Sequence, residues 1–313
     1  MKLSLFKYLL VLATFTTIKQ VELSAQPEFH YLPDQIGWHT ASYDFSAKDA
    51  RLIHLTTWDD GIEREMNFPK PRNGRVYVMA HRGAHIGIPE NSLPAIQKAI
   101  DLGCDFVEID TRATKDGRIV SVHNATIDEY VNGKTGKVKD YTLAELKKLD
   151  IGEKTAPEWK NTRIPTIEEI LQLCRGKIGI YLDLKEDLVA ELLPIIKRYD
   201  MERDIVWYIP ASRMETIIKL KNLSNKCFPM PDPGPESNIV EVVNQVHPRA
   251  LATDMRQLSE GFVKTAHAYG VKVIVDESKG TPEEWGQIIS WGTDGIQTDN
   301  PQALLEYLKI KKE

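Results

Sequence analysis

Residues 76–124 read VYVMAHRGAHIGIPENSLPAIQKAIDLGCDFVEIDTRATKDGRIVSVHN, and this stretch decides the fold. It begins with a short apolar run, Val76–Ala80, and a second run of the same kind lies at Phe106–Asp110. Between the two runs, Ser92–Leu102 places its apolar residues at helical spacing. A strand, a helix and a second strand in this order are typical of a parallel βαβ unit.

The same alternation continues to the end of the chain. Further strands are predicted at Ile119–His123, Ile178–Leu184, Ile205–Ile209, Cys227–Met230, Ala250–Thr253, Val271–Val275 and Gly295–Thr298. Helices are predicted between most of them, at Leu143–Leu149, Ile167–Cys174, Leu188–Tyr199, Arg213–Leu220, Ile239–Val246, Glu260–Tyr269, Pro282–Trp291 and Pro301–Ile310. Strands that alternate with helices form a parallel sheet. Residues 76–313 have the usual length of an α/β, TIM-type (β/α)8 barrel.

Two parts of this barrel depart from a regular repeat. Nine strands are predicted where eight suffice, and we expect the weak run Cys227–Met230 to be a loop. No predicted helix separates Asp110 from Ile119, and Asp116-Gly117 is a tight-turn signal between them. We expect the chain to run briefly back down the barrel and to turn there, so that the strand ending at Asp110 and the strand beginning at Ile119 point the same way. Residues 124–177 are longer than a normal crossover and predict a small insertion after strand 3.

The first 75 residues differ in character from the barrel. Residues 1–26 have the features of a secretory signal peptide: early lysines, the apolar run Tyr8–Ile18 and small residues before Gln26. The apolar run is too short to span a bilayer, which takes about 20 residues, so we expect no stable membrane span. Residues 27–75 form a polar N-terminal extension. The sequence therefore predicts an exported protein, periplasmic or secreted.

The composition excludes several classes of protein. The 313 residues are 42% apolar and 27% charged, as in ordinary soluble domains, which argues against a polytopic membrane protein or a disordered chain. The net charge of −5 offers no basic face for nucleic acid. Three widely spaced cysteines support neither a disulfide framework nor a zinc site.

Four of the predicted strands end in side chains suited to catalysis. In chain order, the polar strand ends are His81-Arg82, Glu108 with Asp110, His123-Asn124, and Asp183 with Lys185. The carboxyl ends of parallel strands meet at one face of a barrel, where barrel active sites are built. Alternate residues of a strand point the same way, so Glu108 and Asp110 share one side. The sequence therefore predicts a cluster of three carboxylates at one rim.

Such a cluster has a definite chemistry. Three carboxylates in a partly buried space repel one another, and a hard divalent cation such as Mg²⁺ or Ca²⁺ relieves the repulsion through oxygen ligands. With Arg82 and Lys185 added, the site suits an anion, above all phosphate. His81 and His123 can then act as general acid and base on a phosphoester. The residues alone thus predict a metal-dependent phosphodiesterase.

The chain also closely resembles the glycerophosphodiester phosphodiesterase family over residues 76–305. The matching segments are HRG at 81–83, PENS at 89–92, E-x-D at 108–110, T-x-DG at 114–117, V-x-V-H at 120–123, IPTIEEIL at 164–171 and GTDGIQTDNP at 292–301. The resemblance implies a barrel with an insertion after the third strand. It also implies hydrolysis of a small-molecule glycerophosphodiester to an alcohol and glycerol 3-phosphate, with one divalent metal, Ca²⁺ or Mg²⁺.

The resemblance assigns roles to individual residues. By position in the motifs, these are catalysis for His81 and His123, phosphate binding for Arg82 and Lys185, metal binding for Glu108, Asp110 and Asp183, and support of the metal site for Glu90, Asn91 and Asn124.

Three departures from the family pattern bear on activity and specificity. Asn124 follows the second histidine where the family usually has aspartate, and Asp183 stands where a glutamate is usual. The W-T-x-N of the late strand is absent, and residues 275–278 read VDES instead. Because those residues usually line the substrate pocket, the head group of the substrate stays open.

Two alternatives remain from the sequence. One is a phospholipase D-like lyase on the same barrel, which would form a cyclic phosphate as its final product. The other is a secreted, non-catalytic barrel that binds phosphodiesters, an interpretation prompted by Asn124 and the missing W-T-x-N. The sequence leaves open the choice between Ca²⁺ and Mg²⁺, which histidine is the acid, and the oligomeric state.

Overall fold

The structure, a computed structural model, describes residues 70–277 and 279–310. The predicted signal peptide at 1–26 and nearly all of the predicted extension at 27–75 lie outside the described residues. Within the described part of the chain, every helix is too short or too polar to cross a bilayer.

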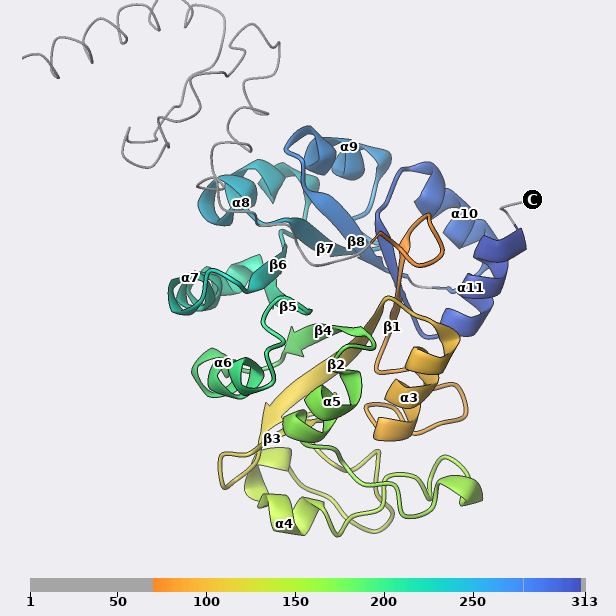
Figure 1. Ribbon diagram of the computed structural model, residues 1–313, viewed down its shortest axis with the longest axis vertical. Coiled ribbons are helices and arrows are strands. Elements are labelled where there is room, and N and C mark those ends of the chain that lie inside the picture. The colour runs from red at the N-terminus through yellow and green to blue at the C-terminus, as the bar shows by residue number, and fades with distance from the viewer. Residues whose placement is uncertain (1–69, 278, 311–313) are drawn as a thin grey trace, which may run out of the picture. The chain divides into compact units, whose positions relative to one another are not determined.

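Eight parallel strands form a nearly closed barrel (Figure 1). In chain order they are β1 (Tyr77–Ala80), β2 (Phe106–Ala113), β4 (Gly179–Leu184), β5 (Ile205–Pro210), β6 (Phe228–Asp232), β7 (Ala250–Asp254), β8 (Lys272–Asp276) and β9 (Gly295–Thr298). Hydrogen-bonded neighbours follow the order β6-β5-β4-β2-β1-β9-β8-β7, and contacts between β6 and β7 bring the two ends together. The predicted TIM-type α/β fold is confirmed.

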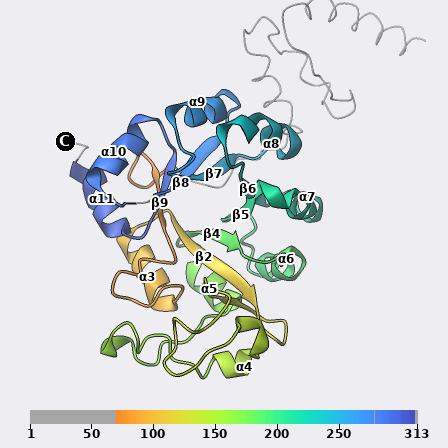
Figure 2. The same cartoon turned by 180° about the vertical axis from the view of Figure 1, so that it is seen from behind.

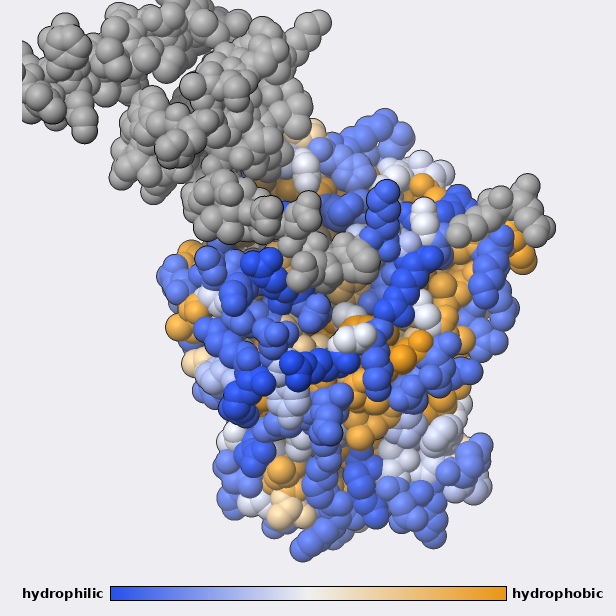
Figure 3. Space-filling view, in the orientation of Figure 1, coloured by the Kyte–Doolittle hydropathy of each residue, from blue (hydrophilic) through white to orange (hydrophobic). Residues whose placement is uncertain are grey.

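The helices surround the barrel, as the opposite view in Figure 2 also shows. They are α3 (Leu93–Leu102), α5 (Ile167–Cys174), α6 (Val189–Arg198), α7 (Met214–Leu223), α8 (Ile239–Val246), α9 (Glu260–Ala268), α10 (Pro282–Ser290) and α11 (Pro301–Ile310). Their apolar faces pack on the outer faces of the strands in one continuous core, which leaves mostly hydrophilic residues on the surface seen in Figure 3. Polar caps fix where helices begin: Ser92 caps α3, and Thr166 with Glu169 forms a capping box at α5.

A second set of apolar side chains fills the inside of the barrel. Its members are Tyr77, Met79, Phe106, Tyr181, Val206, Phe228, Met230, Ala250, Ala252 and Ile274. Gly179 and Gly295 face the same interior, because a Cβ on Gly179 would meet the Phe106 ring at 2.4 Å and one on Gly295 would meet Ile274 at 2.6 Å. The interior is therefore packed, and chemistry is confined to the rim.

Two expectations about the strands were wrong. The run at Cys227–Met230 is not a loop: β6 occupies Phe228–Asp232 and is a full member of the barrel. Pro229 and Pro231 weaken its sequence signal, since proline cannot donate to a ladder.

The third predicted strand also differs from the expectation. β3 (Ile119–Ser121) pairs antiparallel with the end of β2 and lies off the barrel. β2 runs on past Asp110, and the turn at Asp116-Gly117 folds the chain straight back, with Gly117 at φ 72°. A connection this short can join only antiparallel strands.

After β3, the chain builds a small core of its own before it rejoins the barrel. The short helices of this part are η2 (Val138–Asp140), α4 (Leu143–Leu146) and η3 (Pro157–Trp159). Its buried residues are Val120, Val122, Ile127, Val131, Val138, Leu146, Ile151 and Ile164. α5, which follows, packs in the main core of the barrel. The indole N–H of Trp159 donates to the carbonyl of Gly87 (2.7 Å), so this part contacts the loop after β1.

Two further 3-10 turns introduce helices on the other side of the barrel. η4 (Ala211–Arg213) leads into α7, and η5 (Glu236–Asn238) leads into α8.

Candidate active site

The alternation of the strands determines which side chains reach the rim. On each strand, the residue two positions after the last interior residue points into the barrel mouth. These residues are His81, Glu108, Asp183, Tyr208, Asp232, Asp254 and Asp276, and on β9 the corresponding residue is Gln297. The rim is therefore acidic on most strands, and it carries one imidazole at the end of β1.

The three predicted carboxylates lie together on one side of this rim. Asp110 on β2 is in register with Asp183 on β4, and oxygens of Glu108, Asp110 and Asp183 all lie within 4.8 Å of one another. Glu108 and Asp110 are buried, and Asp183 is half-buried. Burial raises the pKa of Glu108 well above its ordinary value, and the negative charge of Asp110 raises it further.

Two cations lie beside these carboxylates. The Lys185 ammonium is 2.9 Å from Asp110 and 2.6 Å from Asp183. The Arg82 guanidinium is 3.9 Å from Asp110, and its Nη1 donates to Glu90 at 3.1 Å. Although burial opposes it, the charges of Asp110 and Asp183 raise the pKa of Lys185, which keeps the ammonium charged.

The loop after β1 is held in a conformation that only a few residues tolerate. Arg82 has a φ of 52°, and Gly83 has a φ of 87° where a Cβ would lie 2.7 Å from the Cβ of Ala95. Glycine is thus required where this loop approaches α3. The conformation points the backbone N–H of Arg82 at Glu108, which accepts its hydrogen bond at 2.7 Å.

His81 lies between two carboxylates. Its Nδ1 is 2.7 Å from Asp299, and its Nε2 is 3.9 Å from Glu108. Burial on its own would lower the pKa of His81, but the hydrogen bond to Asp299, with the charges of Glu108 and Asp276, raises that pKa to about 9. The imidazole therefore favours its protonated form, with Nε2 turned toward the carboxylates.

His123 reaches the same cluster from the hairpin. After the turn, the chain runs back until the N–H of Val122 donates to the carbonyl of Asp110 (3.1 Å), which brings His123 to the rim. The guanidinium of Arg112 fixes this point by donating twice to the His123 carbonyl, at 2.6 and 3.0 Å. Burial raises the pKa of Asp183, and His123 is among the groups that oppose this rise, so the imidazole lies within electrostatic reach of the carboxylates.

Asn124 acts on His123 rather than on the carboxylates. Its Oδ1 is 2.9 Å from Nδ1 of His123, and its Nδ2 donates to Glu129 at 2.7 Å. Because the amide oxygen can only accept, Nδ1 carries the hydrogen and the neutral ring leaves its Nε2 free to accept a proton.

The two predicted support residues of the PEN segment do different things. Asn91, at φ 51°, donates to Asp110 (2.7 Å) and accepts from the backbone N–H of Asp110 (3.1 Å), so it fixes that carboxylate. Glu90 accepts from Arg82 and from the Tyr130 hydroxyl (3.0 Å). Glu90 therefore orients the arginine and lies outside the three-carboxylate group.

The sequence analysis gave Asp299 no role. Asp299 lies two residues after Gln297, just past the end of β9, so the alternation of side chains along this strand could have placed it at the rim. Tyr130 was also missed: it receives a hydrogen bond from the N–H of Asn124 (3.1 Å) and so joins the hairpin to Glu90. No local signal marks Tyr130, because its partners come from distant segments.

We expect Asp299→Asn to lower kcat by about 10- to 1,000-fold with little change in KM. The carboxylate orients His81 and stabilises its protonated form, and an amide can present its oxygen but not its charge. Steady-state kinetics with a glycerophosphodiester would check this, with Asp101→Asn, an exposed residue of α3, as the matched control. An unchanged kcat would show that the contact is only structural.

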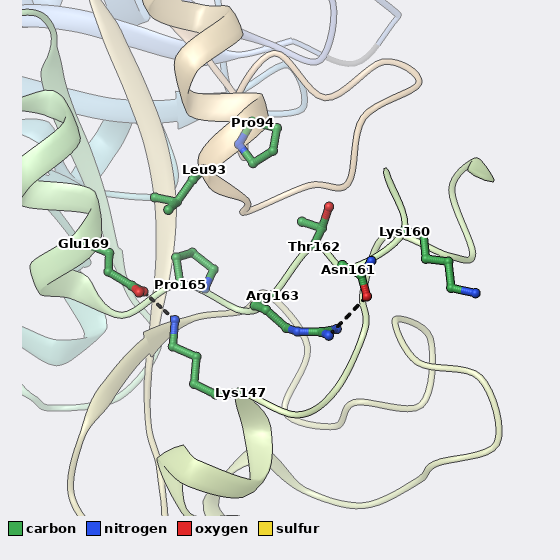
Figure 4. Close-up of a pocket in the computed structure, with 9 residues that line it drawn as sticks. All are labelled: Leu93, Pro94, Lys147, Lys160, Asn161, Thr162, Arg163, Pro165 and Glu169. Atoms are coloured by element: carbon green, nitrogen blue, oxygen red, sulfur yellow. Dashed lines mark hydrogen bonds and ion pairs between the residues drawn. The ribbon is translucent and has the colours of Figure 1, made fainter. Parts of the chain in front are cut away.

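A separate open cavity of about 450 Å³ lies between α3, α5 and the part of the chain that precedes α5 (Figure 4). Its lining consists of Leu93, Pro94, Lys147, Lys160, Asn161, Thr162, Arg163, Pro165 and Glu169. Lys147 is paired with Glu169 at 2.5 Å, and Arg163 contacts Asp150 at 3.7 Å. None of the residues discussed for catalysis lines it.

A parallel barrel whose rim gathers carboxylates, imidazoles, an arginine and a lysine defines a barrel hydrolase for phosphoesters. The comparisons with known proteins specify it further. Residues 81–303 match the glycerophosphoryl diester phosphodiesterase family, and the chain belongs to this family. It is accordingly an enzyme, a phosphoric diester hydrolase.

Two relatives and two solved structures illustrate the similarity. The glycerophosphodiester phosphodiesterase of Caldanaerobacter subterraneus subsp. tengcongensis is 30% identical over 254 residues, which are 75% of this chain and 98% of that protein. That of Bacillus subtilis is 24% identical over 269 residues, 76% of this chain and 87% of that protein.

Among solved structures, the glycerophosphodiester phosphodiesterase of Agrobacterium tumefaciens has a TM-score of 0.67 at 24% identity, covering 74% of this chain and 99% of its own. A phosphodiesterase of Oleispira antarctica, in complex with the product sn-glycerol-3-phosphate, has a TM-score of 0.68 at 24% identity, covering 74% and 96%. These two structures support the fold.

Proposed function

We propose that this enzyme hydrolyses glycerophosphodiesters to an alcohol and glycerol 3-phosphate, with one divalent metal, Ca²⁺ or Mg²⁺. The observation that carries the proposal is the three-carboxylate group, with His81 3.9 Å from Glu108 and His123 within electrostatic reach of Asp183. The printed names of the relatives and the glycerol 3-phosphate bound to the Oleispira protein agree with this substrate class.

The residues present fit a hard divalent cation. Glu108 and Asp110 are buried, burial and then the charge of Asp110 raise the pKa of Glu108, and every ligand atom is oxygen. A cation held by Glu108, Asp110 and Asp183 would polarise a non-bridging phosphate oxygen. The substitution of aspartate for the usual glutamate at position 183 shortens that ligand by one methylene.

The side chains then have distinct tasks. Arg82 and Lys185 bind the phosphate and neutralise the charge that develops on it. His123, with Nε2 free, takes a proton from water as the water oxygen bonds to phosphorus. His81, protonated beside Asp299, donates its proton to the alcohol oxygen as the bond from phosphorus to that oxygen breaks. The proton gained by His123 and the proton lost by His81 balance across the reaction.

An attack by the substrate's own glycerol hydroxyl would give a cyclic phosphate first, as in the lyase alternative. A non-catalytic barrel would bind the diester without turnover. We also propose, from residues 1–26 alone, that the enzyme is exported to the periplasm or secreted.

The decisive experiment is a panel of glycerophosphodiesters assayed with Ca²⁺, with Mg²⁺ and with a chelator, and followed by phosphorus NMR. We expect glycerol 3-phosphate as the product, loss of turnover with the chelator, and recovery when one of the cations is restored. A cyclic phosphate as the final product would favour the lyase. Binding without turnover under all conditions would favour the non-catalytic alternative.

A further inference from the structure

The rim carries a second acidic group opposite the three carboxylates. Asp232, Asp254 and Asp276 end the neighbouring strands β6, β7 and β8, and we call them the acidic row. Asp254 and Asp276 are in direct register. Met230, Ala252 and Ile274, two residues earlier on the same strands, belong to the interior cluster, so the row faces the barrel mouth.

The acidic row is incompletely compensated by its neighbours. Asp254 is paired with Arg256, whose side chain is 85% exposed. Asp232 accepts from the N–H of Gly234 (2.8 Å) and lies 3.4 Å from the Tyr208 hydroxyl, both neutral groups, and the positive charge that acts on it is that of the same exposed Arg256. Burial raises the pKa of Asp232, and the charge of Asp254 adds to the rise. Burial also raises the pKa of Asp276; His81 and Gln297 oppose this rise, and the charges of Asp299 and Asp254 add to it.

Two tyrosine rings lie between the acidic row and the three-carboxylate group. Tyr181 and Tyr208 have ring centroids 5.9 Å apart at 39°, and Tyr181 is buried in the interior. Both rings lie within electrostatic reach of Asp183 and Asp276, which stand on opposite sides of the mouth. Aromatic faces bordered by carboxylates are the surroundings that ammonium and quaternary ammonium groups prefer in proteins.

Gln297 provides an independent indication of a missing ligand. Its side chain is only 5% exposed, and its amide hydrogen-bonds Asp276. Its Oε1 is buried and has no hydrogen-bond partner among the described residues. Gln297 faces the interior as Gly295 does, and it lies in register with Asp276. A buried amide oxygen without a donor is costly, so this end of the acidic row offers an acceptor that is not yet used.

The acidic row also adjoins the catalytic centre on the side where the alcohol would leave. The charge of Asp276 acts on His81, the residue to which we give the proton for the leaving alcohol. A head group attached to that oxygen would therefore extend from His81 along the row toward Asp254 and Asp232.

We propose that Asp232, Asp254 and Asp276, with Tyr208 and Gln297, form the head-group subsite, and that it selects diesters with a cationic head group, an ammonium or a quaternary ammonium. This inference rests on the proposed function. It also bears on the absent W-T-x-N, because Asp276 lies in the segment that replaces it: a carboxylate there attracts a cation, whereas a neutral polyol gains only hydrogen bonds.

The test compares glycerophosphocholine and glycerophosphoethanolamine with the neutral-headed glycerophosphoglycerol, in the metal-loaded enzyme. We expect kcat/KM to favour the cationic substrates about tenfold, the preference to lie in KM, and added salt to reduce it. Asp254→Asn should lower the ratio of cationic to neutral kcat/KM about tenfold. Asp232→Asn, on another strand, should do the same, which guards against a variant that fails to fold. The exposed Asp101→Asn is the control that keeps the ratio.

Failure of this inference can be told from failure of the proposed function. Equal kcat/KM for cationic and neutral substrates, or an unchanged ratio in both variants, overturns the subsite while hydrolysis itself stands. If the wild type hydrolyses no diester, calorimetry with choline against glycerol decides: choline binding that Asp254→Asn weakens supports the subsite without the hydrolysis, and no difference between the two compounds overturns it.

Discussion

Replacing His81 with alanine is expected to lower kcat by about 100- to 10,000-fold, the usual contribution of one general acid or base. The imidazole lies 2.7 Å from Asp299 and 3.9 Å from Glu108, and no other protonated group of the site is directed at the leaving oxygen in the mechanism proposed above. His123→Ala should have an effect of the same size. Because the two residues act on one proton-transfer sequence, the double variant should lose much less than the product of the two effects.

Steady-state kinetics, with added imidazole as a rescue, would measure this. Rescue of either alanine variant would show that the missing group is an acid or base and not a packing element. His267→Ala is the matched control. His267 on α9 is paired with Asp294 (2.8 Å), which precedes β9, whereas Asp299, the partner of His81, follows β9 at the other end of the strand. Retention of full activity by His81→Ala would remove the proposed mechanism.

The position of the carboxylates was accessible from sequence because it depends only on local rules. Alternation within β2 puts Glu108 and Asp110 near one another, and parallel strands bring Asp183 to the same rim. Neither rule requires knowledge of the register, since any parallel barrel of these strands ends its strands at one face. The family resemblance then added roles for these residues, which the residues alone do not supply.

What the sequence did not supply depends on long-range contacts. The orientation of β3 was wrong because the pattern of a short apolar run is the same for an antiparallel hairpin strand as for a parallel one. His123 nevertheless arrives at the rim, since the hairpin rises past Asp110 and returns to it. The contact between His81 and Asp299 joins residues 218 positions apart, and only the closure of the barrel by β1 and β9 brings them together.

The acidic row also depends on contacts between segments that are distant in the sequence. Asp232 ends β6, whose sequence signal is weakened by two prolines. Which residues lie beside Asp232 follows only from the order of the strands in the barrel. From the sequence, Asp276 was part of the VDES segment at 275–278 that replaces W-T-x-N. Its place beside two tyrosines and Gln297 required the register.

Asp110→Asn is expected to remove both the metal-induced stabilisation and most of the activity. In the wild type, a cation at about 100 times its Kd stabilises the folded protein by about 2.7 kcal/mol, which raises Tm by about 5–10 °C in a domain of this size. The variant loses one of three oxygen ligands and the only buried aspartate of the group. We expect its rise in Tm to fall below about 2 °C and its kcat to fall at least about 1,000-fold.

The informative quantity is the rise in Tm when the cation is added. The Tm of the metal-free variant by itself is not informative. Without metal, Asp110→Asn relieves the repulsion from Glu108 but deprives Lys185 of a charged partner, so the two effects oppose each other. Asp254→Asn is the matched control, since it removes a carboxylate from the same rim outside the three-carboxylate group. Differential scanning fluorimetry of both variants with Ca²⁺ and with Mg²⁺ would measure the shift. If Asp110→Asn keeps the wild-type rise in Tm, the cation binds elsewhere, and Lys185 and Arg82 supply the positive charge beside the three carboxylates.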